Sequence, residues 1–398
     1  MMDTLRGLVI TLLGLVLLSM SSEAQDTIVS PKIMELERKL TASDPATHDA
    51  ILTEFIDANR GQFPLIEDSL VTFVFRGQVG LRATVPSDLN RWDTKAHPMI
   101  RLDDTDFYYL TLVLPLDARI DYKFYVDNVW MLDPLNEQTV LGGFGPNSAF
   151  SMPNYVFPSE IEYVDSIPHG KVVEHDFESR VLRNKRKIHV YLPPHYSSGE
   201  TSDSYRVIFV QDGGEFIRLA SMINVLDNLI YENRIPPVVG VFIDPVDRNY
   251  EYFANEKYEK MLVDEILPFI GDRYAIASDP DEVAIIGVSL GGAISLMVAL
   301  DHPELFGKCG SQSGAFDVAE GKLFTLVQSR PSQGVDVYLD CGRFGDLTEV
   351  NRRMRDLLAR KGYRIRYQEF NEGHSWGNWR AHIDDMLVFF WGKEGEEQ

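Results

Sequence analysis

Cysteine is almost absent from this sequence, and the two that occur form no recognisable pattern. Cys309 and Cys341 are the only cysteines among 398 residues. A disulfide-framework domain carries many more at short spacings, so this class is excluded. Neither cysteine joins histidines at zinc-ligand spacing, and we expect no metal and no cofactor. We also expect both thiols to be reduced, because Cys309 should begin one strand and Cys341 should end the next.

Basic residues are scarce relative to acidic ones. The chain has 38 Lys and Arg against 60 Asp and Glu, which gives a formal net charge of -22. Nucleic acids and anionic membrane surfaces bind to basic faces, so neither is expected as a partner. A neutral or weakly charged substrate, such as an ester-bearing carbohydrate or small molecule, fits this composition better.

Long hydrophobic runs are also missing. The most apolar segment, Leu8 to Met20, is shorter than the roughly 20 residues that span a bilayer. It follows Arg6 and precedes Ser22-Glu23-Ala24, which is typical of a cleavable export signal. We therefore expect residues 1–24 to be a signal peptide and the mature protein to be secreted or periplasmic. A retained amino-terminal anchor is the alternative.

The segment 25–66 is predicted to be a helical lead-in. Ile33, Leu36 and Leu40 recur at helical spacing, and a second set follows after Ser43-Asp44-Pro45. We expect these helices to pack on the next part of the chain and to carry no chemistry.

Residues 67–158 are predicted to form a small β-sandwich. Short alternating runs such as Val71, Phe73 and Phe75 are bounded by Pro, Asn and Asp. The stretch from Pro134 to Pro158 is rich in Gly, Pro and Asn, and it reads as a long connection. Whether it is a structured loop or a free linker stays open.

Residues 159–398 have the pattern of an α/β domain. Near-continuous apolar runs predict strands at Val207 to Val210, Val238 to Ile243, Val283 to Ile286 and Val335 to Leu339. Helical patterns lie near 216–232, 256–271, 290–301 and 347–361. This alternation predicts a mostly parallel sheet with helices on both faces.

A candidate nucleophile lies between one of these strands and a helix. Gly287-Val288-Ser289-Leu290-Gly291-Gly292 follows the strand at Val283 and opens an apolar helix. A G-x-S-x-G sequence in a strand-turn-helix context is typical of a nucleophile elbow. We predict that Ser289 is the nucleophile.

A serine nucleophile needs a histidine base and a carboxylate that orients it, in the chain order Ser, Asp, His. His374 lies in a loop just after a late strand, whereas His302 and His382 fall at a helix end and within a helix. We predict His374 as the base. For the acid we favour Asp346 over Asp340, because Asp340 could still belong to its strand.

Two backbone N–H groups should stabilise the oxyanion of the reaction. Leu290, directly after the nucleophile, supplies the first. Asp212-Gly213-Gly214 follows an early strand, and the Gly214 N–H is the predicted second donor. Arg248 and Glu251 follow another strand near the same rim, either as structural ion-pair residues or as substrate contacts.

These motifs together resemble the putative-esterase family, which includes enterochelin esterase, esterase D and feruloyl esterases. The resemblance covers roughly residues 175–391, with anchors at Asp212-Gly213-Gly214, Gly287 to Gly292 and Gly373-His374-Ser375-Trp376. It implies an α/β-hydrolase fold and ester hydrolysis. Many members have an aspartate after the histidine, where this chain has Ser375.

The β-rich part resembles the family-48 carbohydrate-binding module, an immunoglobulin-like sandwich. Asn90-Arg91-Trp92, Tyr122 to Asn128 and Trp130 carry the resemblance. It implies that Trp92 and Trp130 stack on sugars and that Lys123 binds their hydroxyls. The alternative is that the two tryptophans only pack the sandwich against the esterase.

The expected function is that of a secreted serine esterase acting on feruloyl or acetyl esters of a xylan-type polysaccharide. A catecholate-siderophore esterase would use the same triad, as would a trehalose acyltransferase. A catalytically silent glycan-binding protein is the alternative from outside enzymes.

Overall fold

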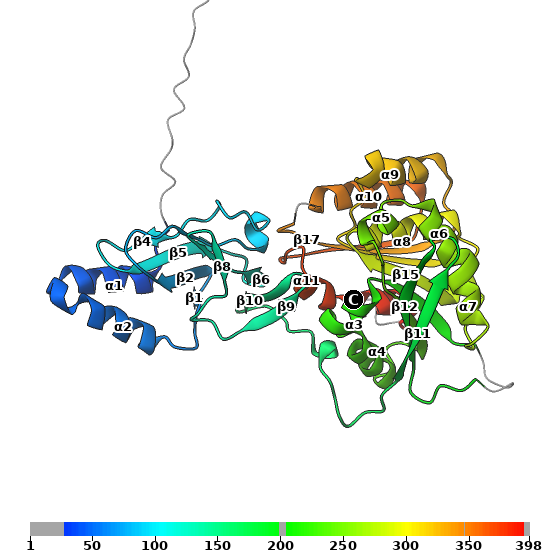
Figure 1. The fold of residues 1–398 in the computed structure, drawn as a ribbon, viewed down its shortest axis with the longest axis horizontal. Coiled ribbons are helices and arrows are strands. Elements are labelled where there is room, and N and C mark those ends of the chain that lie inside the picture. Colours follow the sequence, from blue (N-terminus) through cyan, green and yellow to red (C-terminus); the bar gives the residue numbers. More distant parts are fainter. Residues whose placement is uncertain (1–27, 199–203, 346, 394–398) are drawn as a thin grey trace, which may run out of the picture.

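The computed structural model describes residues 28–198, 204–345 and 347–393. The predicted signal peptide therefore lies outside the described residues. Figure 1 shows two helices and a β-rich part on one side and a larger α/β part on the other. Within the described ranges, no helix is long and apolar enough to cross a membrane.

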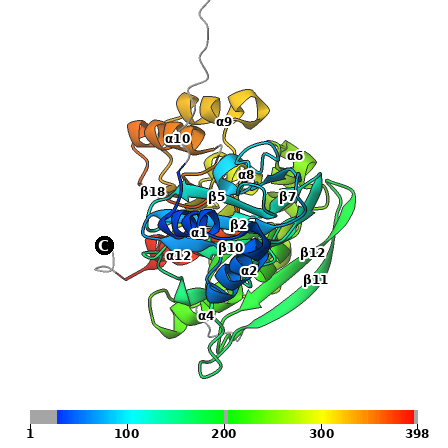
Figure 2. The same cartoon turned by 90° about the vertical axis from the view of Figure 1, so that its left-hand side faces the viewer.

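Two helices open the described chain, as the hydrophobic spacing predicted. They are α1 (Pro31–Thr41) and α2 (His48–Ala58), joined by a short 3₁₀ turn at Pro45–Thr47. Ile33, Leu36 and Leu40 are buried in one cluster with residues of the following sheet, including Val74. The helices therefore cover one face of the β-rich part (Figure 2).

The β-rich part contains three small antiparallel sheets. The first has the order β1 (Leu65–Glu67), β2 (Leu70–Arg76), β5 (Phe107–Val113) and β4 (Ile100–Arg101). The second contains β6 (Arg119–Tyr122), β10 (Gly145–Ser151) and β9 (Thr139–Gly142), and the third contains β3 (Ala83–Thr84), β7 (Phe124–Val126) and β8 (Val129–Met131). Phe73, Phe124 and Phe150 share one core between them. The immunoglobulin-like topology stays a prediction.

The segment from Pro134 to Pro158 differs from the expected connection. Most of it forms the hairpin of β9 and β10, in which Gly145 pairs with Gly142. Gly145 has a φ of 103°, a backbone conformation that glycine tolerates and that closes this tight turn. Glycine content here therefore marks a hairpin and not a linker.

The α/β part is built on one eight-stranded sheet. Its order is β11 (Lys171–Ser179), β12 (Asn184–Leu192), β14 (Val238–Ile243), β13 (Arg206–Gln211), β15 (Val283–Val288), β16 (Lys308–Gln312), β17 (Asp336–Gly342) and β18 (Ile365–Phe370). All pairings among the last six strands of this order are parallel, as predicted. The antiparallel pair β11 and β12 was not predicted.

Helices cover both faces of this sheet, which confirms the α/β-hydrolase fold. On one face lie α5 (Arg248–Tyr252), α6 (Glu256–Met261), the π-helical stretch Leu262–Ile266, α7 (Leu267–Gly271), α8 (Leu290–Asp301), α9 (Val318–Ser329) and α10 (Thr348–Lys361). On the other lie α3 (Gly213–Leu219), α4 (Met222–Tyr231), α11 (Trp376–Arg380) and α12 (Ile383–Trp391). Each face has its own large apolar cluster.

Both cysteines are free and buried, Cys309 near the start of β16 and Cys341 near the end of β17. The predicted placement is therefore confirmed. Titration of the unfolded, unreduced protein with a thiol reagent should detect two thiols. Burial raises the pKa of both, so the folded protein should react far more slowly. Detection of no thiol after unfolding would contradict this arrangement.

Candidate active site

Ser289 occupies a strained turn between β15 and α8. Its backbone angles are φ 56° and ψ −119°, a region that non-glycine residues rarely adopt. The neighbouring glycines make this turn possible, because a Cβ on Gly287 would lie 2.4 Å from the Gly291 carbonyl carbon. One on Gly292 would lie 2.2 Å from the Ser311 hydroxyl oxygen. The sequence thus builds the strained strand-turn-helix geometry that its motif predicted.

His374 lies within hydrogen-bond reach of this serine. Its Nε2 atom is 3.2 Å from the Ser289 Oγ, although the two residues are 85 positions apart. The loop after β18 carries the histidine, and Trp379 packs edge-on against its ring at 5.0 Å between centroids. A neutral imidazole in this position can accept the hydroxyl proton.

The other two downstream histidines are engaged elsewhere. His302 Nε2 is 2.8 Å from Glu259 Oε1, and His382 Nε2 is 2.9 Å from Glu372 Oε1. Within the described ranges, neither has a hydrogen bond to Ser289.

Asp346, the favoured triad acid, lies outside the described residues, so its role stays a prediction. Asp340, the alternative, is fully buried and accepts a hydrogen bond from Gln312 Nε2 at 2.9 Å. Burial raises the pKa of Asp340 to about 7, against a lowering influence from His382. In the part of the chain that the structure describes, Asp340 makes no hydrogen bond with His374.

The two predicted oxyanion donors differ in availability. Leu290 is the first residue of α8, where N–H groups have no acceptor within the helix. Gly214 lies in the first turn of α3, after β13. Its N–H is occupied, because it donates to Asp244 Oδ1 at 2.6 Å. It becomes available to a carbonyl oxygen only when that carboxylate moves away.

Arg248 and Glu251 form ion pairs, though not with each other. Arg248 donates to both carboxylate oxygens of buried Asp212 at 2.8 Å and reaches the Val288 carbonyl at 3.3 Å. It thereby ties the Asp212-Gly213-Gly214 loop to the nucleophile strand. Glu251 pairs with Arg186 at 2.8 Å, and both side chains are buried. The geometry favours the structural interpretation for both residues.

The β-rich part contacts the loop that carries His374. Asp88 lies so close that a Cβ on Gly373 would be 2.2 Å from its carboxyl carbon, and it accepts from the Ser375 hydroxyl at 3.4 Å. Burial, reinforced by Asp121, raises the pKa of Asp88 to about 7. Figure 1 shows α11 against this part of the molecule, and it contacts β6 and β9. Sequence reasoning missed Asp88, which looks like an ordinary turn residue.

The predicted carbohydrate-binding residues lie close to this contact. The Trp92 indole N–H donates to Asp88 Oδ1 at 3.3 Å, and the Trp92 and Trp130 ring centroids are 6.4 Å apart. Tyr125 packs on Trp130 at 5.1 Å. Trp92 and Lys123 are half-buried, whereas Trp130 remains 46% exposed. The cluster thus combines packing with an open indole face.

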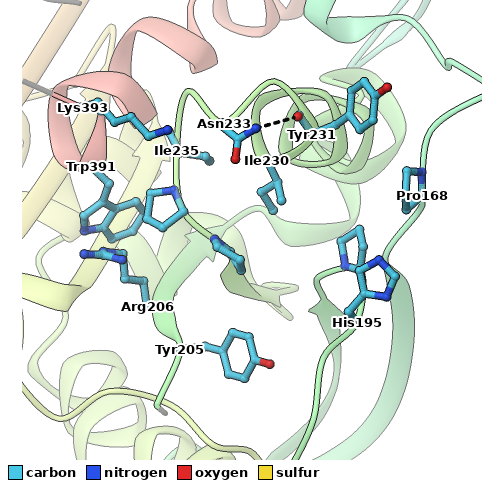
Figure 3. Close-up of a pocket in the computed structure, with 14 residues that line it drawn as sticks. Pro168, His195, Tyr205, Arg206, Ile230, Tyr231, Asn233, Ile235, Trp391 and Lys393 are labelled. Atoms are coloured by element: carbon cyan, nitrogen blue, oxygen red, sulfur yellow. Dashed lines mark hydrogen bonds between the residues drawn. The ribbon is translucent and has the colours of Figure 1, made fainter. Parts of the chain in front are cut away.

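A large cavity lies away from Ser289. It has a volume of about 740 Å³, and its lining includes Tyr205, Arg206 and Trp391 (Figure 3). Tyr205 and Arg206 stand at the beginning of β13, whereas the Asp212 loop follows its end. The two ends of β13 lie at opposite ends of the parallel strands, so this cavity is separate from Ser289. Among the described residues, no group of acidic, histidine or cysteine side chains could hold a metal ion.

Comparison with known proteins identifies the family of this chain. The family model described as "Putative esterase" matches residues 179–390. The protein YjcH of Bacillus subtilis, itself uncharacterised, is 30% identical over 234 residues, which are 55% of this chain and 96% of that protein.

Relatives with named activities include the two that follow. An iron(III) enterobactin esterase of Dickeya dadantii is 26% identical over 56% of this chain and 55% of its own length. An endo-1,4-β-xylanase/feruloyl esterase of Xylanibacter ruminicola is 25% identical over 56% of this chain. The chain spans only about half of the first and 32% of the second.

Among solved structures, the enterobactin esterase of Shigella flexneri has a TM-score of 0.70 at 22% identity. It covers 85% of this chain and 97% of its own, so the similar fold extends beyond the α/β part. The family match spans more than half of the chain and contains both Ser289 and His374. The chain belongs to the putative-esterase family and is a carboxylic ester hydrolase.

Proposed function

We propose that this protein is a secreted serine esterase that cleaves feruloyl or acetyl esters on a xylan-type carbohydrate. The observation that carries the mechanism is the 3.2 Å contact of His374 Nε2 with the Ser289 Oγ at a strained elbow. Membership of an esterase family supports a catalytic role for this pair and argues against a catalytically silent glycan-binding protein.

The reaction follows from these positions. The Ser289 Oγ attacks the ester carbonyl carbon while its proton passes to His374 Nε2. The oxyanion accepts hydrogen bonds from the Leu290 N–H and, once Asp244 has turned away, the Gly214 N–H. Collapse of this intermediate breaks the bond to the alcohol, which leaves with the proton from His374. Water then repeats the cycle on the acyl-enzyme, and Asp346 orients His374 throughout.

Several observations support a carbohydrate ester as the substrate. The net charge of -22 favours a neutral ligand. The relative from Xylanibacter ruminicola is named for xylanase and feruloyl esterase activities. Near the His374 loop, the half-exposed indole of Trp130 offers an apolar face of the kind that packs on sugar rings.

A catecholate-siderophore ester is the second candidate. The Shigella flexneri enterobactin esterase favours it, because its fold resembles both the β-rich and the α/β parts. The carboxylates of Asp244 and Glu215 near the proposed oxyanion site disfavour a strongly anionic ligand, whereas Asp212 is paired with Arg248.

A substrate panel separates the two candidates. Purified mature protein should release acid from methyl ferulate or acetylated xylan with a higher kcat/KM than it cleaves ferric enterobactin. The reverse order would assign the siderophore ester instead. No cleavage of any of the three would refute both proposals.

We further expect the β-rich part to bind a neutral polysaccharide weakly through Trp92, Lys123 and Trp130. The Ser289→Ala protein should be retarded during electrophoresis in gels that contain xylan or glycogen, and Trp130→Ala should abolish that retardation. Tyr231→Ala, which removes an exposed aromatic ring from the α/β part, is the matched control. Absence of retardation in every gel, with unfolding of the Trp130 variant, would assign the tryptophans to packing.

A further inference from the structure

Asp244 occupies a donor that the proposed mechanism needs. It directly follows β14, and its Oδ1 atom accepts the Gly214 N–H at 2.6 Å. The two groups are in close contact, since a Cβ on Gly214 would lie 2.9 Å from the same oxygen. In the proposed mechanism the carbonyl oxygen of the ester binds this N–H, so a carboxylate oxygen occupies that position in the structure.

The backbone of Asp244 is held in place, whereas its carboxylate has a second partner. The Asp244 N–H donates to the Lys187 carbonyl at 3.3 Å, and its own carbonyl accepts from Arg186 Nη1 at 3.4 Å. The Oδ2 atom lies 3.3 Å from His189 Nε2, and the side chain is 32% exposed. An incoming carbonyl oxygen can therefore displace Oδ1 from Gly214 while the contact with His189 persists.

Displacement leaves a carboxylate oxygen without its donor and beside a developing negative charge. Two negative charges at a few ångströms repel each other, and loss of a charge-assisted hydrogen bond is costly. A hydroxyl group of the substrate removes both penalties, because it can donate to Oδ1 and stand between the two charges. With an ester that lacks such a donor, the Asp244 carboxylate repels the oxyanion and has also lost its hydrogen bond from Gly214.

We propose that Asp244 is a specificity-determining residue that selects esters with a free hydroxyl beside the ester group. Monoesters of polyols, which include sugar esters, have this chemistry. The inference rests on the proposed function, because it assigns the Gly214 N–H to the oxyanion. Sites built to pair with a substrate hydroxyl discriminate strongly against analogues that lack it.

Steady-state kinetics with two neutral acetates test this role on the full mature chain. Glyceryl monoacetate has a vicinal diol beside its ester, and ethyl acetate has no hydroxyl. The ratio of their kcat/KM values should favour glyceryl monoacetate in the unaltered protein. Asp244→Asn should lower this ratio by about tenfold or more, because a neutral acceptor binds the hydroxyl more weakly and opposes the oxyanion less. Asp244→Leu, without any acceptor, should lower the ratio further.

Asp247→Asn is the matched control. Asp247 is exposed three residues away and caps α5 through the Tyr250 N–H, a role that asparagine also fills. Its ratio should equal that of the unaltered protein. If Asp244→Leu does not fold, the near-isosteric Asp244→Asn decides alone. An unchanged ratio in Asp244→Asn would overturn the role of Asp244 and leave the esterase intact. No turnover of either acetate by a preparation that cleaves methyl ferulate would also overturn the role of Asp244, whereas no cleavage of methyl ferulate, acetylated xylan or either acetate would refute the proposed function as well.

Discussion

Replacement of Ser289 by alanine should lower kcat for p-nitrophenyl acetate by about 10⁴- to 10⁶-fold. The residual rate would come from binding and from the oxyanion donors, because alanine cannot attack the carbonyl carbon. The unusual backbone angles at this position cost serine and alanine a similar conformational free energy, so the thermal unfolding midpoint should change little. Initial rates and a thermal melt of the same preparation measure both quantities.

Ser295→Ala is the control for this experiment. Ser295 lies farther along the same helix, is fully buried, and donates to the Gly291 carbonyl. Alanine is a strong helix former, so this variant should fold and keep most of its activity. Near-normal turnover by Ser289→Ala would show that another group attacks the ester and would remove the basis of the mechanism.

The sequence predicted the elements whose physical causes are local. The strand at Val283 is buried on both faces, so its apolar run is continuous and easy to identify. The turn at Ser289 needs glycines where backbone or side-chain atoms approach within van der Waals distance, and this requirement fixes their spacing. His374 could be predicted because the loop after a late parallel strand lies at the same end of the sheet as the turn that carries Ser289. The structure places the two side chains within hydrogen-bond reach.

Other features depend on partners distant in sequence and could not be predicted in this way. The pair β11 and β12 lies at the sheet edge, where most of the β11 side chains are exposed and the apolar pattern is weak. Asp88 contacts Gly373, almost 300 residues later in the chain, only because the fold brings the β-rich part against the His374 loop. Asp244 likewise follows an ordinary buried strand, and only the fold brings its carboxylate to Gly214.

The same distinction applies to the acid of the triad. Both candidates follow the predicted strand near Val335, and the pattern alone cannot tell which carboxylate turns toward His374. The environment of Asp340 argues against it. Its Oδ2 accepts from Gln312, and burial raises its pKa to about 7, so a charged carboxylate is disfavoured there. An orienting acid must instead remain ionised to stabilise the imidazolium that forms.

Asp346→Asn should therefore lower kcat by about 10,000-fold, because an amide can stabilise the wrong histidine tautomer. Asp340→Asn should lower it by less than about tenfold. Its amide oxygen can still accept from Gln312, and a neutral group suits the buried site. Hydrolysis of p-nitrophenyl acetate across pH 5 to 9, with a thermal melt of each variant, measures the ranking. If Asp340→Asn folds and loses more of its kcat than Asp346→Asn, then Asp340 is the acid of the triad. A purely structural carboxylate beside Gln312 should instead affect stability more than the chemical step.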